Sequence, residues 1–423
     1  MTQQYHSAAH KLTAISDELA DIFLELDDEI HGLALALLAD TNVLLLGPPG
    51  VGKTKLVETF SRRIVGGKHF AWMLNNYSAP EELAGSHSLQ HIMQDKYVRI
   101  TDGKLPEAHT AFIDEIFKGN SGVINFLLTI LNERAFYNDG VRTKVPLLGL
   151  FGASNELPEE SDGLGAALDR FAIKYDVKPV KENDSFKRML LTPVRERAIE
   201  QERTPTTIDI LELLEARDLV RNVIVPEPIL NLFVEIRQNL NKLNVEPSSR
   251  VWVKCIQILQ AEAFLHGSDT VLQEHLHQLK NCLWSKPSEI PHVESVIFKY
   301  VTPHFYECKQ IYNGILSVFQ NVVTTYKDGK LAGSQKTGIT AEAAEKVKKG
   351  NQRLTQIRQQ MHKANDTKDI ETVEEMSENA VKIIQALLAH VASDAPLVDP
   401  TTPLGTRKKA AAAAARAAGK SQQ

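Results

Sequence analysis

Apolar residues recur every three or four positions along the first 40 residues of the chain. This spacing places them on one side of a helix, and Asp27 and Asp28 interrupt it, so we expect two helices rather than one. A short apolar stretch at 42–46 then enters a segment rich in Gly and Pro, which predicts a buried strand followed by a loop. Helical spacing returns over residues 53–64.

Strands and helices continue to alternate beyond this loop. Apolar runs at 111–113 and 147–153 predict two further strands, and residues 119–132 between them have helical spacing. Strands that alternate with helices form a parallel sheet covered on both faces, so the pattern predicts an α/β domain. Two hairpin-like inserts interrupt the plan, at 86–103 and at 134–145, the second around an Asn-Asp-Gly turn.

The chain changes character after Pro179, where helical segments are joined by short polar connections. Residues 327–340 are rich in Lys, Gly and Ser and are expected to form a loop. Two charged segments then predict an antiparallel helical hairpin with Ser377 in its seam. We expect four parts: an α/β domain (1–180), an all-helical domain (181–309), a helical C-terminal region containing the hairpin (310–392) and a flexible basic tail (393–423).

Composition narrows the class of protein. The 423 residues are 43% hydrophobic and carry a formal net charge of -5, which is typical of a globular chain and gives no global positive field for a nucleic acid or anionic membrane. Three Cys residues without ligand-like spacing predict buried thiols in a reducing compartment and argue against zinc. The N-terminus lacks the pattern of a signal peptide, and the apolar run at 32–39 is too short for a membrane span, so we expect a cytoplasmic protein.

The tail from Arg407 to Lys420 is rich in Ala and has five basic and no acidic residues. It has no apolar face to bury, so we interpret it as a disordered solubilising tail. The alternative is contact with an anionic partner.

One loop carries a specific chemical signal. It fits the pattern G-x-x-x-x-G-K-[ST], which binds nucleoside triphosphates. The glycines let backbone N–H groups approach phosphate oxygens, and the helix that follows directs the positive end of its dipole at them. We expect the lysine to reach the β- and γ-phosphates and the threonine hydroxyl to bind Mg²⁺. The residues are Gly47, Pro48, Pro49, Gly50, Val51, Gly52, Lys53 and Thr54.

A second strand ends in two carboxylates, Asp114 and Glu115. In this order after a phosphate loop, Asp114 is expected in the Mg²⁺ shell and Glu115 at the attacking water, because phosphoryl transfer depends on the placement of that water. The presence of both carboxylates argues against a scaffold that binds ATP without hydrolysing it. A third strand leads to Asn155, which we expect to orient the water or contact the γ-phosphate.

Two arginines, Arg170 and Arg250, lie at the edges of the α/β and helical regions. An arginine near the γ-phosphate stabilises developing charge in the transition state, and the alternative for each is a surface ion pair. Spacing alone does not decide between them.

Together these motifs resemble the MoxR family of AAA+ ATPases, and within it most closely the RavA subgroup of regulatory ATPases. The resemblance covers roughly residues 8–300. Besides the loop, it rests on SAPEE at 78–82, LPEA at 105–108, FIDEIFK at 112–118, LLTILNERAF at 127–136, ASNELPE at 153–159 and LDRF at 168–171.

The resemblance implies a hexameric ring with ATP and Mg²⁺ between subunits, and remodelling or assembly of a partner protein with a von Willebrand factor A domain. By position, Asn155 resembles sensor 1, Arg170 the arginine finger that acts on the neighbour's ATP, and Arg250 sensor 2 of the helical lid. Arg134 is a rival for the trans-acting arginine. The two inserts resemble elements that face the ring pore or a client.

One departure and one alternative stay open. RavA-like members carry a β-rich insertion in their C-terminal part, and no strand-rich run follows residue 300 here, so that partner module is not carried over. The alternative function is a nucleic-acid motor or antiviral-defence ATPase, in which basic residues would line the pore: Arg99, Lys104, Arg142 and Lys144. The net acidic chain and the few aromatic residues in the inserts argue against it.

Overall fold

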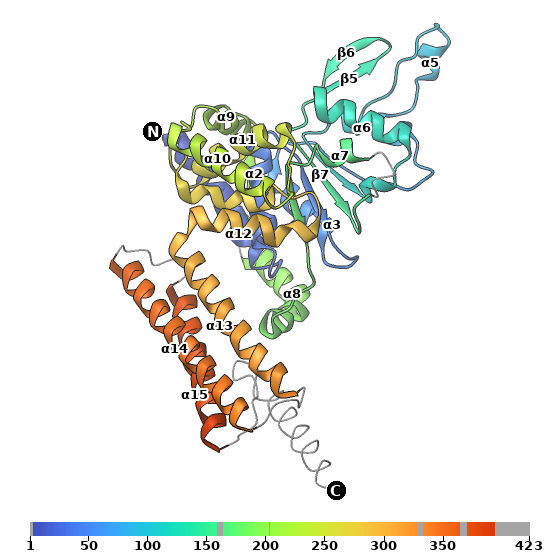
Figure 1. Cartoon of the computed structure of the whole chain (residues 1–423). Coiled ribbons are helices and arrows are strands. Elements are labelled where there is room, and N and C mark those ends of the chain that lie inside the picture. Colours follow the sequence, from blue (N-terminus) through green and yellow to red (C-terminus); the bar gives the residue numbers. More distant parts are fainter. Residues whose placement is uncertain (1–2, 159–163, 203, 328–332, 364–369, 394–423) are drawn as a thin grey trace. The chain divides into compact units, whose positions relative to one another are not determined.

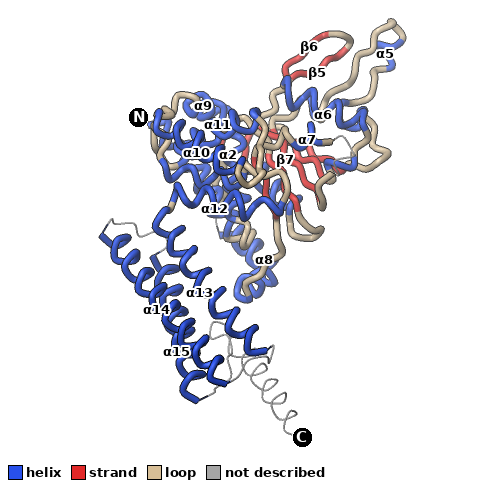
Figure 2. Tube along the Cα trace, viewed as in Figure 1, coloured by secondary structure: helices blue, strands red, loops and turns tan. Residues whose placement is uncertain are grey.

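The computed structural model describes residues 3–158, 164–202, 204–327, 333–363 and 370–393. The chain divides into two compact units, residues 1–297 and residues 298–423, and each is taken by itself (Figures 1 and 2). The predicted basic tail lies outside the described residues, which end at Ser393. None of the described helices has the length and apolarity that crossing a membrane requires.

A parallel five-stranded sheet forms the centre of the first unit, as predicted. Its strand order is β3-β4-β7-β1-β8, so the strand that enters the phosphate loop is flanked on both sides. The three strands expected from apolar runs are the inner ones, and β3 and β8 at the two edges were not predicted. The strands are β1 (Val43–Leu46), β3 (His69–Met73), β4 (Thr110–Asp114), β7 (Gly149–Ser154) and β8 (Ile173–Asp176).

Helices pack on this sheet. The two N-terminal helices are separate, as the interruption at Asp27 and Asp28 predicted: α1 (Gln3–Ala20) and α2 (Asp27–Leu38). Helix α2 packs on β1, β7 and β8, and α3 (Lys53–Ser61), which follows the phosphate loop, packs on β4 and β7. Helix α6 (Ser121–Glu133) starts two residues later than predicted because the Asn120 side chain caps it, accepting from Val123 N at 3.1 Å.

The two predicted inserts project together from the sheet (Figure 1). The first follows α4 (Pro80–Ala84) and contains α5 (Leu89–Ile92) and a bridge between His87 and Arg99, and the second is the hairpin β5 (Ala135–Asn138) and β6 (Val141–Lys144). The Asn138 side chain joins them, because it accepts from Arg99 N at 2.7 Å and donates to Arg99 O at 3.2 Å. Asn138 thus pairs with the first insert as a neighbouring strand would. Short 3₁₀ turns η1 (Leu105–Glu107) and η2 (Ile116–Lys118) flank β4.

The rest of the first unit is mainly helical. One exception is a two-residue strand, β9 (Ile208–Asp209), which pairs with β2 (Ile64–Val65) and so ties this region to the end of α3. Helices α9 and α11 pack against α1 and α2. The helices are α7 (Gly165–Leu168), α8 (Asn183–Glu202), α9 (Ile210–Val220), α10 (Glu227–Asn241), α11 (Ser249–Leu265) and α12 (Ile290–Val301), with 3₁₀ segments η4 (Gln273–Asn281) and η5 (Pro287–Glu289).

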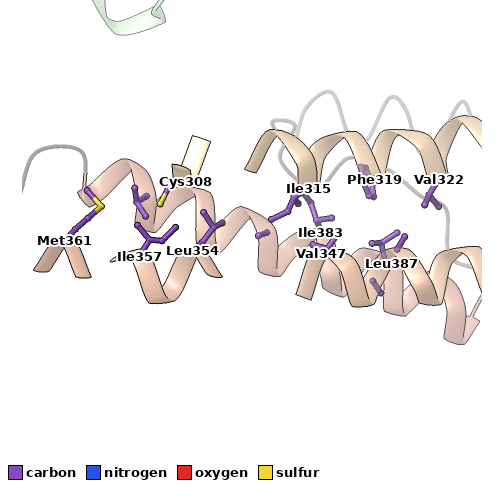
Figure 3. Close-up of a cluster of buried hydrophobic side chains, with 14 residues drawn as sticks. Cys308, Ile315, Phe319, Val322, Val347, Leu354, Ile357, Met361, Ile383 and Leu387 are labelled. Carbon is purple, nitrogen blue, oxygen red and sulfur yellow. The ribbon is translucent and has the colours of Figure 1, made fainter. Parts of the chain in front are cut away.

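The described part of the second unit contains three long helices that pack on one another: α13 (Pro303–Lys327), α14 (Gly333–Lys363) and α15 (Ile370–Ser393). Figure 3 shows their shared apolar core, with Ile315 and Phe319 of α13 facing α14 and α15. The predicted hairpin is therefore part of a three-helix bundle. Ser377 does lie in the seam, where its hydroxyl donates to Asn351 Oδ1 at 2.8 Å.

The prediction of a loop at 327–340 is wrong for residues 333–340, which the structure describes. Helix α14 begins at Gly333, and Thr340 on it is completely buried. Polar composition suggested a loop, but packing against α13 and α15 extends the helix over this segment, and tertiary contacts outweigh weak local preference. The cysteines agree with expectation, because Cys255, Cys282 and Cys308 are buried free thiols.

Candidate active site

The phosphate loop connects the carboxyl end of β1 to α3, as predicted. Gly47, Gly50 and Gly52 have φ angles of 149°, 85° and 91°, which side chains other than glycine's adopt at a cost. A Cβ on Gly47 would lie 2.2 Å from the carbonyl oxygen of Val177, which follows β8. Glycine at this position therefore permits both the turn and close packing against the neighbouring strand.

Lys53, the first residue of α3, is buried with 7% of its surface exposed. Its ammonium group donates to the Gly47 carbonyl, to the Pro48 carbonyl at 3.2 Å and to Asn155 Oδ1 at 3.3 Å. Burial lowers the pKa of Lys53, although the charges of Asp114 and Glu115 act in the opposite direction. The loop's own carbonyls thus hold the ammonium where a phosphate would be bound.

Thr54 and Asp114 meet at the same edge of the sheet. The Thr54 hydroxyl donates to Asp114 Oδ2 at 3.2 Å, although the two residues are 60 positions apart. A hydroxyl and a carboxylate are oxygen donors of the kind that Mg²⁺ prefers, since it is held by one or two carboxylates together with substrate phosphates. The donor set therefore fits the metal that accompanies a triphosphate.

Glu115 follows β4 in a left-handed conformation, with φ 51° and ψ 45°. Its side chain is 15% exposed and lies between two partners: Asn155 Nδ2 donates to Oε1 at 2.6 Å, and Lys118 Nζ lies 3.2 Å from Oε2. Left-handed backbone at a residue other than glycine is uncommon and is concentrated at functional sites. This conformation turns the Glu115 carboxylate toward Asn155.

Asn155 therefore links the lysine to the glutamate. Its carbonyl oxygen accepts from Lys53, and its amide nitrogen donates to Glu115. The three strands that carry these groups are adjacent in the sheet, so their carboxyl ends meet at one edge. The structure thus brings together five of the predicted site residues: Lys53, Thr54, Asp114, Glu115 and Asn155.

The remaining predicted residues, Arg170 and Arg250, lie at the amino ends of the strands. We call this side of the sheet its amino edge, and the side of the phosphate loop its carboxyl edge. Arg170 precedes the amino end of β8, and its carbonyl accepts from the side chain of Asn42, which precedes β1, at 3.0 Å. Its guanidinium contacts Asn132, and its Nη1 lies 3.3 Å from Asp169 Oδ2. Four residues of β1, roughly 13 Å of strand, separate this edge from the phosphate loop.

Arg250 is the second residue of α11 and lies beside Arg170. Its Nη1 donates to Asp169 Oδ2 at 2.6 Å, and the Ser248 hydroxyl, which caps α11, contacts the other oxygen of Asp169. The Arg250 side chain is 50% exposed. One carboxylate therefore gathers both predicted arginines, away from the phosphate loop of the same chain.

Arg134, the rival arginine, lies at the same edge. It ends α6 in a left-handed conformation with φ 47°, and its carbonyl accepts from Val145 N at 2.8 Å, which closes the base of the β5–β6 hairpin. Its guanidinium lies 3.3 Å from Asp40 Oδ1 and 3.4 Å from Asn42 Oδ1. The sequence analysis missed the residues that hold this edge together, Asp40, Asn42 and Asp169. A polar residue directly before a buried strand was the only signal for Asn42.

Comparison with known proteins agrees with this architecture. Residues 10–216 match a family model described as the MoxR domain in the MoxR-vWA-beta-propeller ternary systems, and residues 228–297 match an AAA lid domain. An uncharacterised protein of Methanocaldococcus jannaschii is 34% identical over 290 residues, which cover 68% of this chain and 74% of that protein. The chaperone MoxR1 of Mycobacterium tuberculosis is 29% identical over 283 residues, 63% of this chain and 72% of that protein.

A solved structure has the same fold. A putative ATPase from Cytophaga hutchinsonii aligns with a TM-score of 0.55 and 15% identity, covering 71% of this chain and 97% of that chain. The closer likeness to the RavA subgroup stays a prediction. The family model, the lid domain and the identity over nearly three quarters of these relatives show the family: the chain belongs to the MoxR family of AAA+ ATPases.

Proposed function

We propose that this protein hydrolyses ATP with Mg²⁺ at the carboxyl edge of the sheet. Lys53 exchanges the carbonyls of its own loop for phosphate oxygens, and Thr54 and Asp114 hold the metal. Bound Mg²⁺ supplies positive charge that neutralises the phosphates. Glu115, whose carboxylate accepts a hydrogen bond from the Asn155 amide at 2.6 Å, orients the attacking water and accepts a proton from it.

We further propose that each site is shared between two copies of the chain in a hexameric ring. The observation that carries this proposal is the division of charged groups between two edges of one sheet. The phosphate-binding set occupies the carboxyl edge, whereas Arg170 and Arg250 share Asp169 at the amino edge. In a ring, the amino edge of one subunit meets the carboxyl edge of the next, so Arg170 acts on the neighbour's ATP.

Mixing two inactive variants tests the shared site. Glu115→Gln should bind ATP without turnover, and Arg170→Ala should bind ATP and lose hydrolysis, by about 10³-fold or more if it is the finger. A mixture of the two should regain turnover, because some interfaces combine an intact Glu115 with an intact Arg170. A mixture as inactive as its components would refute sharing between subunits, and full activity of Arg170→Ala alone would assign the role to Arg134.

The work performed with ATP is proposed to be the remodelling or assembly of a partner protein. The matching family model is described by its association with von Willebrand factor A-domain and β-propeller proteins, which supports a partner of that class. Large apolar side chains are exposed on the joined inserts, including Leu89 at 75%, Met93 at 87% and Tyr97 at 69%. Such exposure on a projecting element favours contact with a protein.

Nucleic acid is the second candidate, and the inserts argue against it. Of the four basic residues considered for a pore, Arg99 is paired with Glu81 at 3.0 Å, and Lys104 donates to the Glu82 carbonyl at 3.0 Å. Both are therefore committed within the chain. ATPase stimulation by DNA that falls steeply with added salt would reverse this preference, whereas co-purification of a von Willebrand A-domain protein from the native host would support the first.

A further inference from the structure

Three cations converge on one acidic residue at the amino edge. Asp40 lies between α2 and β1 in a left-handed conformation, with φ 50°. Its Oδ1 is 2.8 Å from Arg217 Nη2 of α9 and 3.3 Å from Arg134 Nη2, which follows α6. Lys254 of α11 donates to the Asp40 backbone carbonyl at 2.7 Å. Helices α9 and α11 and the end of α6 therefore meet at this residue.

The positively charged groups of this cluster outnumber the carboxylates that face them. Three cations face a single carboxylate, and nearby Asp218 is paired with Arg221 at 2.9 Å. Arg217 is only 9% exposed, and an incompletely paired cation in such a place is costly. Although burial opposes it, the charges of Arg217, Arg134 and Lys254 hold the pKa of Asp40 below its usual value. Asp40 is therefore ionised and is shared by the three cations.

Arg134 receives the weakest share. It competes with Arg217 for the same oxygen of Asp40, and its contact is the longer one, 3.3 Å against 2.8 Å. Its other hydrogen bond, to Asn42, is 3.4 Å long, and its Nη1 is buried without a hydrogen-bond partner among the described residues. Since Asn42 also binds the Arg170 carbonyl, the underpaired guanidinium of Arg134 lies next to the predicted finger.

We propose that Arg217 is a positioning residue that occupies the Asp40 carboxylate, so that Arg134 remains available to bind the neighbouring subunit's triphosphate beside Arg170. This inference rests on the proposed shared site. Phosphate oxygens are stronger partners for a guanidinium than the two long contacts that Arg134 now has, because they are charged and accept bidentate hydrogen bonds. Without Arg217, Asp40 would hold Arg134 instead.

The test compares kcat and KM for ATP in Arg217→Met and in the double variant Asp40→Asn, Arg217→Met. Loss of Arg217 should let Asp40 capture Arg134 and lower kcat about tenfold with KM nearly unchanged, which corresponds to ~1.4 kcal/mol. Removing the Asp40 charge as well should restore most of kcat, because the competing carboxylate is gone. Arg221→Met, four residues further along the chain, is the matched control, and it should keep wild-type activity.

A positioning role predicts that kcat recovers in the double variant while KM stays unchanged in both variants. A structural role predicts instead that kcat follows the free energy of unfolding in urea, because removing only one partner of a buried pair is the more destabilising change. Wild-type kcat in Arg217→Met, or a double variant no faster than the single one, would overturn the proposal. Arg217→Lys keeps the positive charge and should retain activity. If the variants differ in solubility, comparing kcat between Arg217→Lys and Arg217→Met provides the same test. The mixing experiment on Glu115 and Arg170 reports separately whether the site is shared at all.

Discussion

Gly47 offers a sharp test of how the phosphate loop is held against the sheet. A Cβ at this position would lie 2.2 Å from the Val177 carbonyl oxygen, and ordinary contact begins at 3.4 Å, so 1.2 Å of separation is missing (3.4 minus 2.2). The Val177 amide donates to the Leu46 carbonyl at 2.7 Å. The strand therefore cannot retreat without weakening the pairing of β8 with β1.

The expected cost of Gly47→Ala has two parts. Forcing an extra carbon into a packed region costs about 1–3 kcal/mol. Holding alanine at φ 149° costs a further amount of about 1–3 kcal/mol. The sum, about 2–6 kcal/mol, is a large fraction of the 5–15 kcal/mol or so that stabilises a typical domain.

Gly50→Ala is the matched control, because Gly50 also has a positive φ of 85° but no atom of the described residues lies within 4 Å of its Cβ position. The three tryptophans, Trp72, Trp252 and Trp284, all belong to the first unit, so their fluorescence during urea unfolding reports on that unit alone. Without nucleotide, Gly47→Ala should be less stable than Gly50→Ala by about 1–3 kcal/mol, the overpacking part. Equal free energies of unfolding for the two variants would refute the packing argument.

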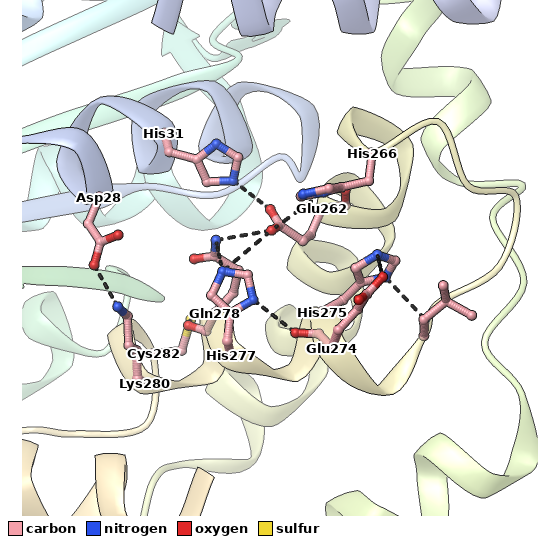
Figure 4. Close-up of polar contacts among 11 residues, drawn as sticks. Asp28, His31, Glu262, His266, Glu274, His275, His277, Gln278, Lys280 and Cys282 are labelled. Atoms are coloured by element: carbon pink, nitrogen blue, oxygen red, sulfur yellow. Dashed lines mark hydrogen bonds and ion pairs between the residues drawn. The ribbon is translucent and has the colours of Figure 1, made fainter. Parts of the chain in front are cut away.

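Three further outcomes are expected. Lys53→Ala should abolish nucleotide binding in a fluorescent-nucleotide titration, and near-normal affinity would contradict its assignment to the phosphates. Asn155→Ala should keep that affinity and lower kcat by about 10²-fold, because it frees the Glu115 carboxylate, and unchanged turnover would argue against its orienting role. The pair of His31 and Glu262 (Figure 4), 2.6 Å apart, should make stability depend on pH. Burial disfavours the charged form of both residues. Their hydrogen bond nevertheless raises the pKa of His31. The same hydrogen bond, together with the charges of His31 and neighbouring histidines, lowers the pKa of Glu262 to about 2.

The sign of that pH dependence follows from the two shifts. The contribution of His31 is complete below its unfolded pKa, about 6.5, and is lost as pH rises through the raised folded value. The contribution of Glu262 is present above its unfolded pKa of 4.5 and is lost only as pH falls toward 2. Urea unfolding should therefore show this stabilisation at pH 6 and its loss at pH 9. In His31→Gln the difference between pH 6 and pH 9 should shrink, and an unchanged difference would exclude the pair as its source.

The sequence predicted the inner strands of the sheet and missed its edges for a physical reason. β1 is a continuous apolar run that is buried on both faces, and such runs are visible without any knowledge of neighbours. β8 alternates apolar with polar or charged residues over only four positions, and β3 is a short strand whose residues are mostly exposed. Their pairing with inner strands decides that they are strands, and that information is not local.

The same distinction holds for the site. The groups proposed to bind phosphate and metal follow strands in a recognisable order, so Lys53, Asp114 and Asn155 were predicted from spacing. Asp40 and Asn42 have no motif of their own, and their roles come from contacts with α6, α9 and α11, which are distant in sequence. Sequence spacing also could not say which edge of the sheet Arg250 faces, because that depends on the packing of α11 against α1 and α2.

Arg134 joins two tasks in one residue. Its guanidinium reaches the amino edge of the sheet, while its left-handed backbone ends α6 and starts the β5–β6 hairpin. A pull on that side chain is thus delivered to the hairpin without an intervening residue, and Asn138 passes it on to the first insert through Arg99. A change of partner at the Arg134 guanidinium would therefore bear directly on the backbone that joins α6 to the hairpin, and Asn138 ties the hairpin to the first insert.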